Sequence, residues 1–383
     1  MDSLEKFATE KLAELEAQHL RRWLVETDRT EDAIAMRNGK RLISFCCNDY
    51  LNLSQHPEVK RAAIAATQTF GAGAGASRLV SGNHSLYGEL EAALARLKGT
   101  EAACVFGSGY LVNLGIIPAL VGSGDLILAD ALSHACLLAG GRLSGAQTLI
   151  FRHNDMAHLA ALLRIHRKTY RHCLILTDGV FSMDGDLAPV RELAEIAHAC
   201  DAWLMTDDAH GIGVLGDGRG SSFADGGKAD VPLQMGTLSK AVGVYGGYIC
   251  ASHAVIDLIR TRARTLIYST GLPPGVAAAA IASLEIIARD PQLRAAPLHK
   301  ARRFTRAMNL PDAQSPIVPL IIGDAARALA LSTMLEEAGF LVTAIRPPTV
   351  PDGTARLRFT FTAAHQDADI ERLASTLQMA GLT

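Results

Sequence analysis

Short apolar runs alternate with longer stretches of helical spacing through the middle of the chain. The apolar runs cover residues 103–106, 125–129, 148–151, 173–177, 203–206, 231–235 and 245–251. Runs of this length fit buried strands, and helices that separate such strands are typical of βαβ units. The pattern therefore predicts an α/β fold whose mostly parallel, seven-stranded sheet is flanked by helices.

The two ends of the chain show other patterns. Apolar residues recur every three or four positions between residues 2 and 24, which predicts an amphipathic helix. After residue 273, an Ala-rich helix and a basic helix over 294–306 precede strands at 317–322, 340–344 and 356–361 and a closing helix from residue 363. We therefore expect an N-terminal helix and segment over 1–47, a large α/β domain over 48–272 and a small α+β domain over 273–383.

The charge balance narrows the choice of partners. The chain has 37 basic and 39 acidic residues, which gives a formal net charge of −2 at pH 7. Such a chain has no positive surplus to hold a nucleic acid or an acidic membrane surface. The longest apolar stretches, 111–129 and 271–287, are interrupted by proline and polar residues, so neither predicts a membrane span. We expect neither nucleic acid nor membrane as a partner.

The cysteines and the start of the chain indicate a compartment. Seven cysteines stand at wide spacing without a Cys-x-x-Cys pair, which argues against a disulfide framework or a thiolate zinc site. Acidic residues and lysines alternate along the first 16 residues and leave no room for the apolar core of an export signal. We therefore expect a cytoplasmic protein with reduced thiols.

Polar residues that follow the predicted strands are the first candidates for chemistry. Ligands of an open parallel sheet bind beyond the carboxyl ends of its strands. After the run 103–106, Gly107, Ser108 and Gly109 lead into an apparent helix. Small residues at a helix N-terminus let backbone N–H groups approach a phosphate, although an ordinary turn is the other interpretation.

Acidic residues and a histidine follow the run 203–206. Asp207, Asp208 and His210 could bind a divalent metal or cap the next segment, or Asp207 could hold a ring nitrogen protonated. Adjacent carboxylates on a strand point to opposite faces, which disfavours a shared metal ion. We therefore expect no metal site. Asp184 and Asp186, after the run 173–177, fit turns.

Lys240 lies between small hydroxyl residues and a glycine-rich stretch, which leaves room around its amine. A phosphate turn, an acid ahead of such a lysine, and His134 beyond the run 125–129 are together the parts of a pyridoxal 5′-phosphate enzyme. In such an enzyme the lysine forms the Schiff base, and the acid keeps the pyridine nitrogen protonated so that the ring accepts electrons.

Four motifs of the sequence resemble those of the α-oxoamine synthases, a branch of the fold type I pyridoxal-phosphate enzymes. They are Asn48-Asp49-Tyr50-Leu51, Ser81-Gly82, Asp207-Asp208-Ala209-His210-Gly211 and Thr237-Leu238-Ser239-Lys240. The resemblance runs from about residue 20 to about residue 380 and implies a pyridoxal-phosphate-dependent acyltransferase that is a homodimer with shared active sites. Residues 342–351 and 354–358 are most similar to the branch that joins L-alanine to a pimeloyl thioester of coenzyme A or a carrier protein. The branch that joins glycine to an acetyl thioester is the alternative.

The resemblance also implies roles for single residues. Lys240, Asp207 and His134 are the implied catalytic residues, with His134 stacked on the cofactor ring and reaching the substrate. The implied cofactor contacts are Ser108, Gly109, Tyr110, His134, Ser182, Asp207, His210, Thr237, Lys240 and, from the neighbouring subunit, Thr270. The implied substrate contacts are Arg21, Asn48, His134, Thr349 and Arg358, of which Asn48 and Arg358 would hold the amino-acid carboxylate. Asn52 departs from the family, which usually has glycine there.

Two other functions fit less of the sequence. A nicotinamide dehydrogenase could use the glycines of residues 71–75, but a helical stretch precedes them and their spacing is not the dinucleotide fingerprint. A non-catalytic binding module on the same fold would be expected to lack the lysine, and Lys240 is present.

Overall fold

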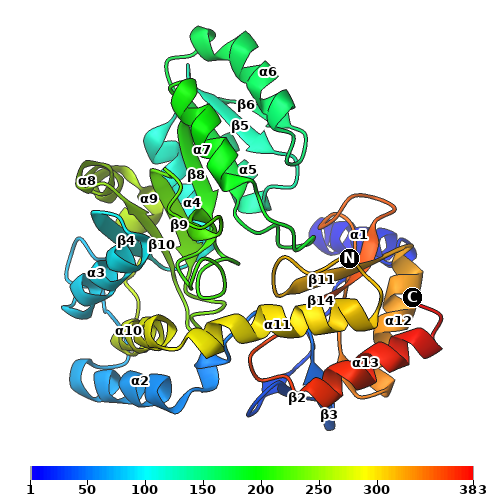
Figure 1. The fold of residues 1–383 in the computed structure, drawn as a ribbon. Coiled ribbons are helices and arrows are strands. Elements are labelled where there is room, and N and C mark those ends of the chain that lie inside the picture. Colours follow the sequence, from blue (N-terminus) through cyan, green and yellow to red (C-terminus); the bar gives the residue numbers. More distant parts are fainter. Residues whose placement is uncertain (1, 383) are drawn as a thin grey trace.

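A seven-stranded sheet forms the centre of the computed structural model, which describes residues 2–382 (Figure 1). Its strands are β4 (Ala102–Phe106), β5 (Leu126–Asp130), β6 (Gln147–Phe151), β7 (Cys173–Asp178), β8 (Trp203–Asp207), β9 (Leu233–Thr237) and β10 (Gly247–Ala251). The order across the sheet is β4-β10-β9-β8-β7-β5-β6. The strands from β9 to β6 pair in parallel, and β10 runs antiparallel to both of its neighbours. The predicted mostly parallel, seven-stranded sheet is confirmed.

Helices cover both faces of this sheet because its central strands are apolar on both sides. Along β5, Ile127 and Ala129 pack toward helices α4 (Gly109–Leu120), α5 (Ala135–Ser144) and α8 (His253–Arg262). The alternate residues Leu126 and Leu128 pack toward α6 (Met156–His166) and α7 (Val190–Ala199). This two-residue alternation is what a strand buried on both faces requires.

The N-terminal segment contains strands that the apolar pattern did not reveal. Strands β1 (Asp28–Arg29), β2 (Ile34–Arg37) and β3 (Lys40–Ser44) form a small sheet with β12 (Phe340–Leu341), which lies parallel to β3. Ile43 and Phe45 are buried in the same core as Phe304 and Phe359. The start of the chain therefore packs with its C-terminal part.

The C-terminal part is built around a second, three-stranded sheet. Its order is β11 (Ile317–Gly323), β14 (Ala355–Thr360), β13 (Thr343–Ile345), and all neighbours are antiparallel. Helices α11 (Pro291–Ala307), α12 (Ala325–Glu337) and α13 (Asp367–Met379) accompany it. The prediction of one strand over 340–344 was wrong. Phe340 and Leu341 pair with β3, whereas Thr343 to Ile345 pair with β14, so the run is shared between two sheets.

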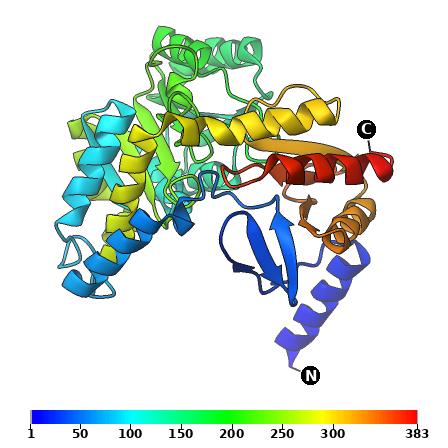
Figure 2. The same cartoon turned by 60° about the horizontal axis from the view of Figure 1, so that its bottom comes forward.

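Helix α10 (Pro274–Arg289) lies with the large sheet although it follows Pro273 (Figure 2). Ala277, Ala280 and Leu284 share a core with Leu90 and Leu94 of α3 (Leu86–Lys98). Helix α2 (Pro57–Phe70) also packs on α10. Helix α10 thus shares a core with residues of the predicted large domain, and the division at residue 272 stays a prediction.

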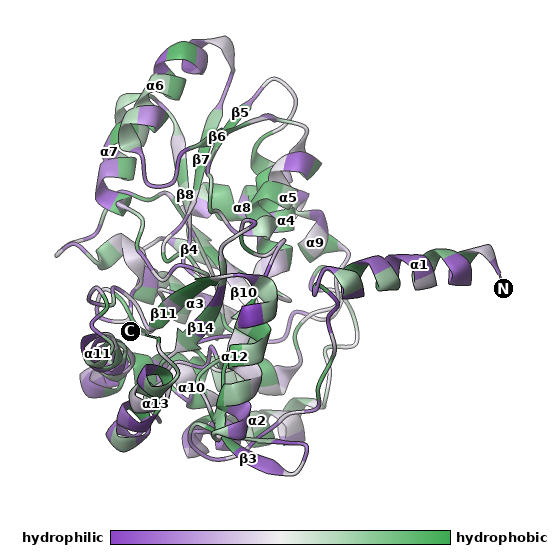
Figure 3. Cartoon of the chain, turned by 90° about the vertical axis from the view of Figure 1, so that its right-hand side faces the viewer, coloured by the Kyte–Doolittle hydropathy of each residue, from purple (hydrophilic) through white to green (hydrophobic). Residues whose placement is uncertain are grey.

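Helix α1 (Ser3–Ala17) projects from the body of the protein (Figure 3). The prediction of a helix over 2–24 is confirmed for its first part only. The helix ends at Ala17 because His19 adopts a left-handed backbone conformation with φ 57°. Leu4 and Phe7 are 71% and 59% exposed, and no described residue of α1 is buried. Among residues 2–382, no helix is both long and apolar enough to span a bilayer.

Candidate functional site

A cavity of about 200 Å³ lies at the carboxyl end of the large sheet. Its wall brings together the ends of β8 and β9 and the starts of α4 and α5. The lining residues are Ser108, Gly109, Tyr110, His134, Cys136, Asp178, Asp207, Ala209, His210, Met235, Thr237, Ser239 and Lys240. Eight of the ten implied cofactor contacts therefore surround one space.

Asp207 and Asp208 diverge at the end of β8, as their alternation on the strand predicts. Asp207 faces the cavity, where Oδ2 accepts a hydrogen bond of 2.9 Å from Asn113 and Oδ1 accepts one of 3.0 Å from the backbone of Ala209. Asp208 turns away and forms a fully buried ion pair with Lys98, with 2.6 Å between Nζ and Oδ2. Within residues 2–382, no group of three or more metal-ligating side chains is present.

Lys240 lies on the loop that follows β9, half-buried in the cavity wall. Burial lowers the pKa of its amine below the usual value, the charge of Asp207 opposes this shift, and Arg358 adds to it. A larger fraction of the amine is then unprotonated near neutral pH, and only the unprotonated form can act as a nucleophile or accept a proton.

The start of α4 offers backbone donors to the cavity. Ser108 caps the helix by accepting a hydrogen bond from Leu111 N–H, at 3.3 Å. The N–H groups of Gly109 and Tyr110 donate to no other group of residues 2–382. A Cβ atom at Gly247 would lie 2.5 Å from Gly109 N, so glycine is required where β10 approaches this helix end. With the Thr237 side chain beside them, these free donors suit an anionic ligand.

His210 is held against the cavity by Tyr50, whose hydroxyl lies 2.6 Å from His210 Nδ1. Burial raises the pKa of Tyr50 to about 12, so its hydroxyl keeps the proton and donates it. Burial lowers the pKa of His210 well below its usual value, and the Lys240 charge acts in the same direction. The neutral form of the imidazole is therefore favoured.

Arg358 reaches this region from β14 of the small sheet. Its Nε donates to the backbone carbonyl of Ser182 at 2.5 Å, and Nη1 donates to Asn48 Oδ1 at 3.1 Å. Its Nη2 is buried without a partner among the described residues. The neighbouring arginine on the same strand face, Arg356, differs because Asp184 neutralises it at 2.5 Å. Arg358 is thus a buried cation that neutral groups hold in place, and it lacks an anion.

A larger cavity of about 760 Å³ adjoins the site, and His134 lines both. Ser182 and Thr349 line it, as does Arg22, which donates to Thr349 Oγ1 at 2.9 Å. Arg21 lies elsewhere: it pairs with Glu16 at 3.3 Å and stacks on the Trp23 ring. The structure does not bring Arg21 to this cavity, and the basic side chain that reaches it is Arg22. Arg21 and Arg22 are adjacent in the sequence, and no feature of the sequence indicates which of them reaches the cavity.

Thr270 also lies outside the cavity wall. It is exposed and forms an isolated β-bridge with Ser77. Large apolar side chains near this bridge are exposed as well, with Val80 at 80% and Tyr268 at 71%. An implied role of Thr270 in a neighbouring subunit stays a prediction.

His153, which the sequence did not single out, connects two loops of the site. Its Nδ1 lies 2.9 Å from Asp130 at the end of β5, and its Nε2 lies 2.7 Å from Asp186. Asp130 also accepts from Leu132 N–H in the turn that leads to His134. Burial works against the charge of His153, but the hydrogen bonds and charges of the two carboxylates outweigh it and raise the pKa to about 10. Asp184 and Asp186 do lie in a turn, as predicted, and both also form ion pairs.

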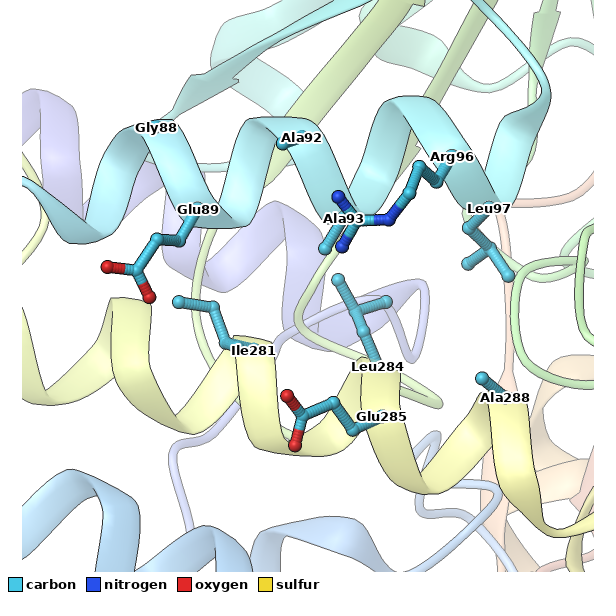
Figure 4. A pocket seen from close by; sticks show the side chains of 10 residues that line it. All are labelled: Gly88, Glu89, Ala92, Ala93, Arg96, Leu97, Ile281, Leu284, Glu285 and Ala288. Atoms are coloured by element: carbon cyan, nitrogen blue, oxygen red, sulfur yellow. The ribbon is translucent and has the colours of Figure 1, made fainter.

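A separate groove of about 670 Å³ runs between α3 and α10 (Figure 4). Alanines, glycine and leucines line most of it, with Glu89, Arg96 and Glu285 along its rim. It shares no residue with the cavity that contains Lys240. The groove is therefore separate from the cavity that contains Lys240.

Several known proteins are similar to this chain along most of its length. Residues 40–377 match the family model described as aminotransferase class I and II. The 8-amino-7-oxononanoate synthase of Methylocella silvestris is 65% identical over 343 residues, which cover 90% of this chain and 98% of that protein. The 8-amino-7-oxononanoate synthase of Maricaulis maris is 60% identical over 376 residues, 98% of this chain and 96% of that protein.

Solved structures share the fold. A serine palmitoyltransferase from S. paucimobilis with bound PLP and myriocin has a TM-score of 0.93 and 31% identity, covering 100% of this chain and 98% of that chain. An 8-amino-7-oxononanoate synthase from Francisella tularensis has a TM-score of 0.74 and 28% identity, covering 89% and 99%. The predicted α/β fold with a smaller C-terminal part is confirmed.

Replacing His153 by Gln should destabilise the protein in a pH-dependent way. The pKa of His153 is raised in the folded state, so its contribution is fully present below about pH 6.5 and is lost as the pH rises through about 10. We expect His153→Gln to lower the free energy of unfolding by about 2 kcal/mol at pH 6, with the difference from the parent shrinking toward pH 10. Urea unfolding at several pH values measures this. The control is the exposed His299→Gln, which should change stability by less than about 0.5 kcal/mol at every pH. A loss of stability in His153→Gln that does not depend on pH would contradict a charged His153 between Asp130 and Asp186.

Proposed function

The chain belongs to the aminotransferase class I and II family, and from this premise we propose that it condenses L-alanine with a pimeloyl thioester. The products are 8-amino-7-oxononanoate, carbon dioxide and the free thiol, which is a step of biotin biosynthesis. Relatives with 65% and 60% identity carry the name of this activity. The observation that carries the proposal is Arg358, a buried cation without an anion beside the cavity of Lys240 and Asp207. It suits the carboxylate of an amino acid.

The cofactor is pyridoxal 5′-phosphate, and the cavity fits it. The free N–H groups of Gly109 and Tyr110 suit the phosphate, and Thr237, whose hydroxyl here donates to the Gly246 carbonyl at 2.8 Å, lies beside them. Asp207, fixed by Asn113, suits a protonated pyridine nitrogen, and Lys240 supplies the amine. When bound, this cofactor accepts the electron pair that remains on the amino-acid carbon after proton loss or decarboxylation.

Each side chain of the site then has its own role in the reaction. Arg358 and Asn48 bind the alanine carboxylate and orient its Cα–H bond. Lys240, with its lowered pKa, takes the Cα proton and later returns one. A bond forms between Cα and the thioester carbonyl carbon, the C–S bond breaks, and the alanine carboxylate leaves as carbon dioxide. The 760 Å³ cavity, with Arg22 and Thr349, has room for the acyl chain.

The active form is proposed to be a homodimer in the cytoplasm. The exposed apolar residues around the Ser77–Thr270 bridge support a covered surface next to the site. In the dimer, Thr270 of each subunit would reach the phosphate in the other. All seven cysteines are free, which fits a reducing compartment.

Borohydride should attach the cofactor to Lys240. We expect a yellow protein whose visible absorption band disappears on reduction, with the pyridoxyl group found on Lys240 by peptide mass spectrometry. Lys240→Ala should abolish the label and lower the turnover rate by at least about 10³-fold, because the base is lost. The control Lys168→Ala, at an exposed position, should behave as the parent. A colourless protein that takes up no pyridoxal phosphate would contradict the proposal.

Substrate choice should favour the larger diacid chain. We expect L-alanine with pimeloyl-CoA to release thiol faster than glycine with acetyl-CoA or L-serine with palmitoyl-CoA, as followed with a thiol reagent. Pimeloyl-carrier protein is tested in parallel to compare the two thioester forms. Faster release from glycine and acetyl-CoA would assign the alternative acyltransferase activity instead.

Sedimentation velocity should give twice the 40.7 kDa mass of the chain. Thr270→Ala should weaken cofactor binding about tenfold, because one hydrogen bond to a charged phosphate is lost. Hybrids of Lys240→Ala and Thr270→Ala subunits should regain one normal site, so activity at limiting cofactor should exceed that of either variant alone. A monomeric mass, or hybrids without such a gain, would refute the shared site.

A further inference from the structure

Cys136 lies at the centre of a chain of polar contacts behind His134. Its Sγ is 2.7 Å from His134 Nδ1 and 3.0 Å from the Asn113 amide nitrogen. Asn113 also donates to Asp207. Cys136 and Asn113 are buried, whereas His134 is partly exposed to solvent and lines both cavities.

The direction of these contacts follows from which atoms can donate. The Asp207 carboxylate only accepts, so the amide of Asn113 must turn its NH₂ group toward it. The same NH₂ group then donates to Cys136 Sγ. The opposite orientation of the amide would place Asn113 Oδ1 against the carboxylate, where two acceptors would repel each other. In the present orientation Oδ1 accepts no hydrogen bond from the described residues. The sulfur is therefore an acceptor from Asn113, and its own proton is free to point at His134.

The thiol keeps that proton. Burial raises the pKa of Cys136 to about 12, and the negative charge of Asp207 adds to the effect. Burial also lowers the pKa of His134, with Lys240 acting in the same direction and Asp207 opposing it. A thiol that donates to a neutral imidazole fits these directions better than a thiolate beside an imidazolium.

A hydrogen bond from the backbone indicates the same protonation state for His134. The N–H of Cys136 donates to His134 Nδ1 at 3.3 Å, where the histidine caps α5. A backbone N–H can only donate, so this contact favours the form in which Nδ1 is unprotonated. The other charged group in contact with this residue, Asp178, accepts from the backbone N–H of His134 and leaves the ring unaffected.

We propose that Cys136 is a positioning residue whose thiol, together with its backbone N–H, holds His134 in the neutral form with its proton on Nε2. The free edge of the ring then offers an Nε2–H donor at the junction of the two cavities, where it can bind an oxygen of the substrate. Use of that donor by a substrate rests on the proposed function, whereas the protonation state of the ring does not. His134 thus acts as a fixed donor toward the substrate.

The test is the ¹⁵N NMR spectrum of histidine side chains in the holoenzyme. His134 is one of 13 histidines, so His134→Asn identifies its signals. In the parent, Nε2 of His134 should be protonated and Nδ1 unprotonated from pH 6 to pH 9. Cys136→Ser keeps a hydroxyl donor and should keep this form. Cys136→Ala should shift the ratio of the two neutral forms at least about fivefold toward Nδ1–H, because a donor is lost.

The control is Cys200→Ala, which removes a thiol that lies outside the cavity and should leave the His134 signals unchanged. A protonated Nδ1 in the parent would overturn the proposal, as would Cys136→Ala signals that match those of the parent. These readings are independent of turnover. If the alanine and pimeloyl assay fails while His134 shows Nε2–H and the Cys136→Ala shift, the proposed function is wrong and the positioning role stands.

Discussion

The buried ion pair of Lys98 and Asp208 fixes the edge of the sheet on which the site depends. Both side chains are fully buried, so each charge needs the other to avoid the cost of an unpaired ion. Lys98 also donates to the backbone of Arg219, and Asp208 accepts from Ser221 N–H. The end of β8 is thereby attached to α3 and to the loop after residue 211. Because neighbouring residues of a strand point to opposite faces, Asp207 then points into the cavity while Asp208 is held on the other side of the strand.

The other ionisable side chains of the site are arranged in a similar way. Each ionised group that faces inward either has a counter-ion, as Arg356 has Asp184, or is the group that a ligand would neutralise. Burial lowers the pKa of His210 and of His134, which favours the neutral form of both rings. Asp207 therefore faces the space that a cationic ring nitrogen would occupy, and Arg358 lies beside the cavity with Nη2 free for an anion.

The sequence predicted the large sheet and the residues of its carboxyl edge well, because both depend on local patterns. Seven apolar runs correspond to seven strands, and Lys240, Asp207 and His134 follow such runs directly. Contacts between distant segments could not be predicted in this way. β3 pairs with β12 about 300 residues later, and Asn113 meets Asp207 from within an apolar helix. Asn52 is an instructive departure: its backbone has φ 56°, a conformation that explains the usual glycine and that asparagine also tolerates.

The small sheet contributes to the site through one residue, and this has a consequence for turnover. Arg358 is held by the carbonyl of Ser182 and the amide of Asn48, which give direction but no negative charge. An alanine carboxylate would complete the pair, and an amine without a carboxylate would leave the cation as it was. If the proposed reaction takes place, that carboxylate would leave as carbon dioxide, and the product would no longer contain the anion that Arg358 is placed to bind. On this proposal, decarboxylation would remove the contact between the bound molecule and Arg358 and so would favour release of the product.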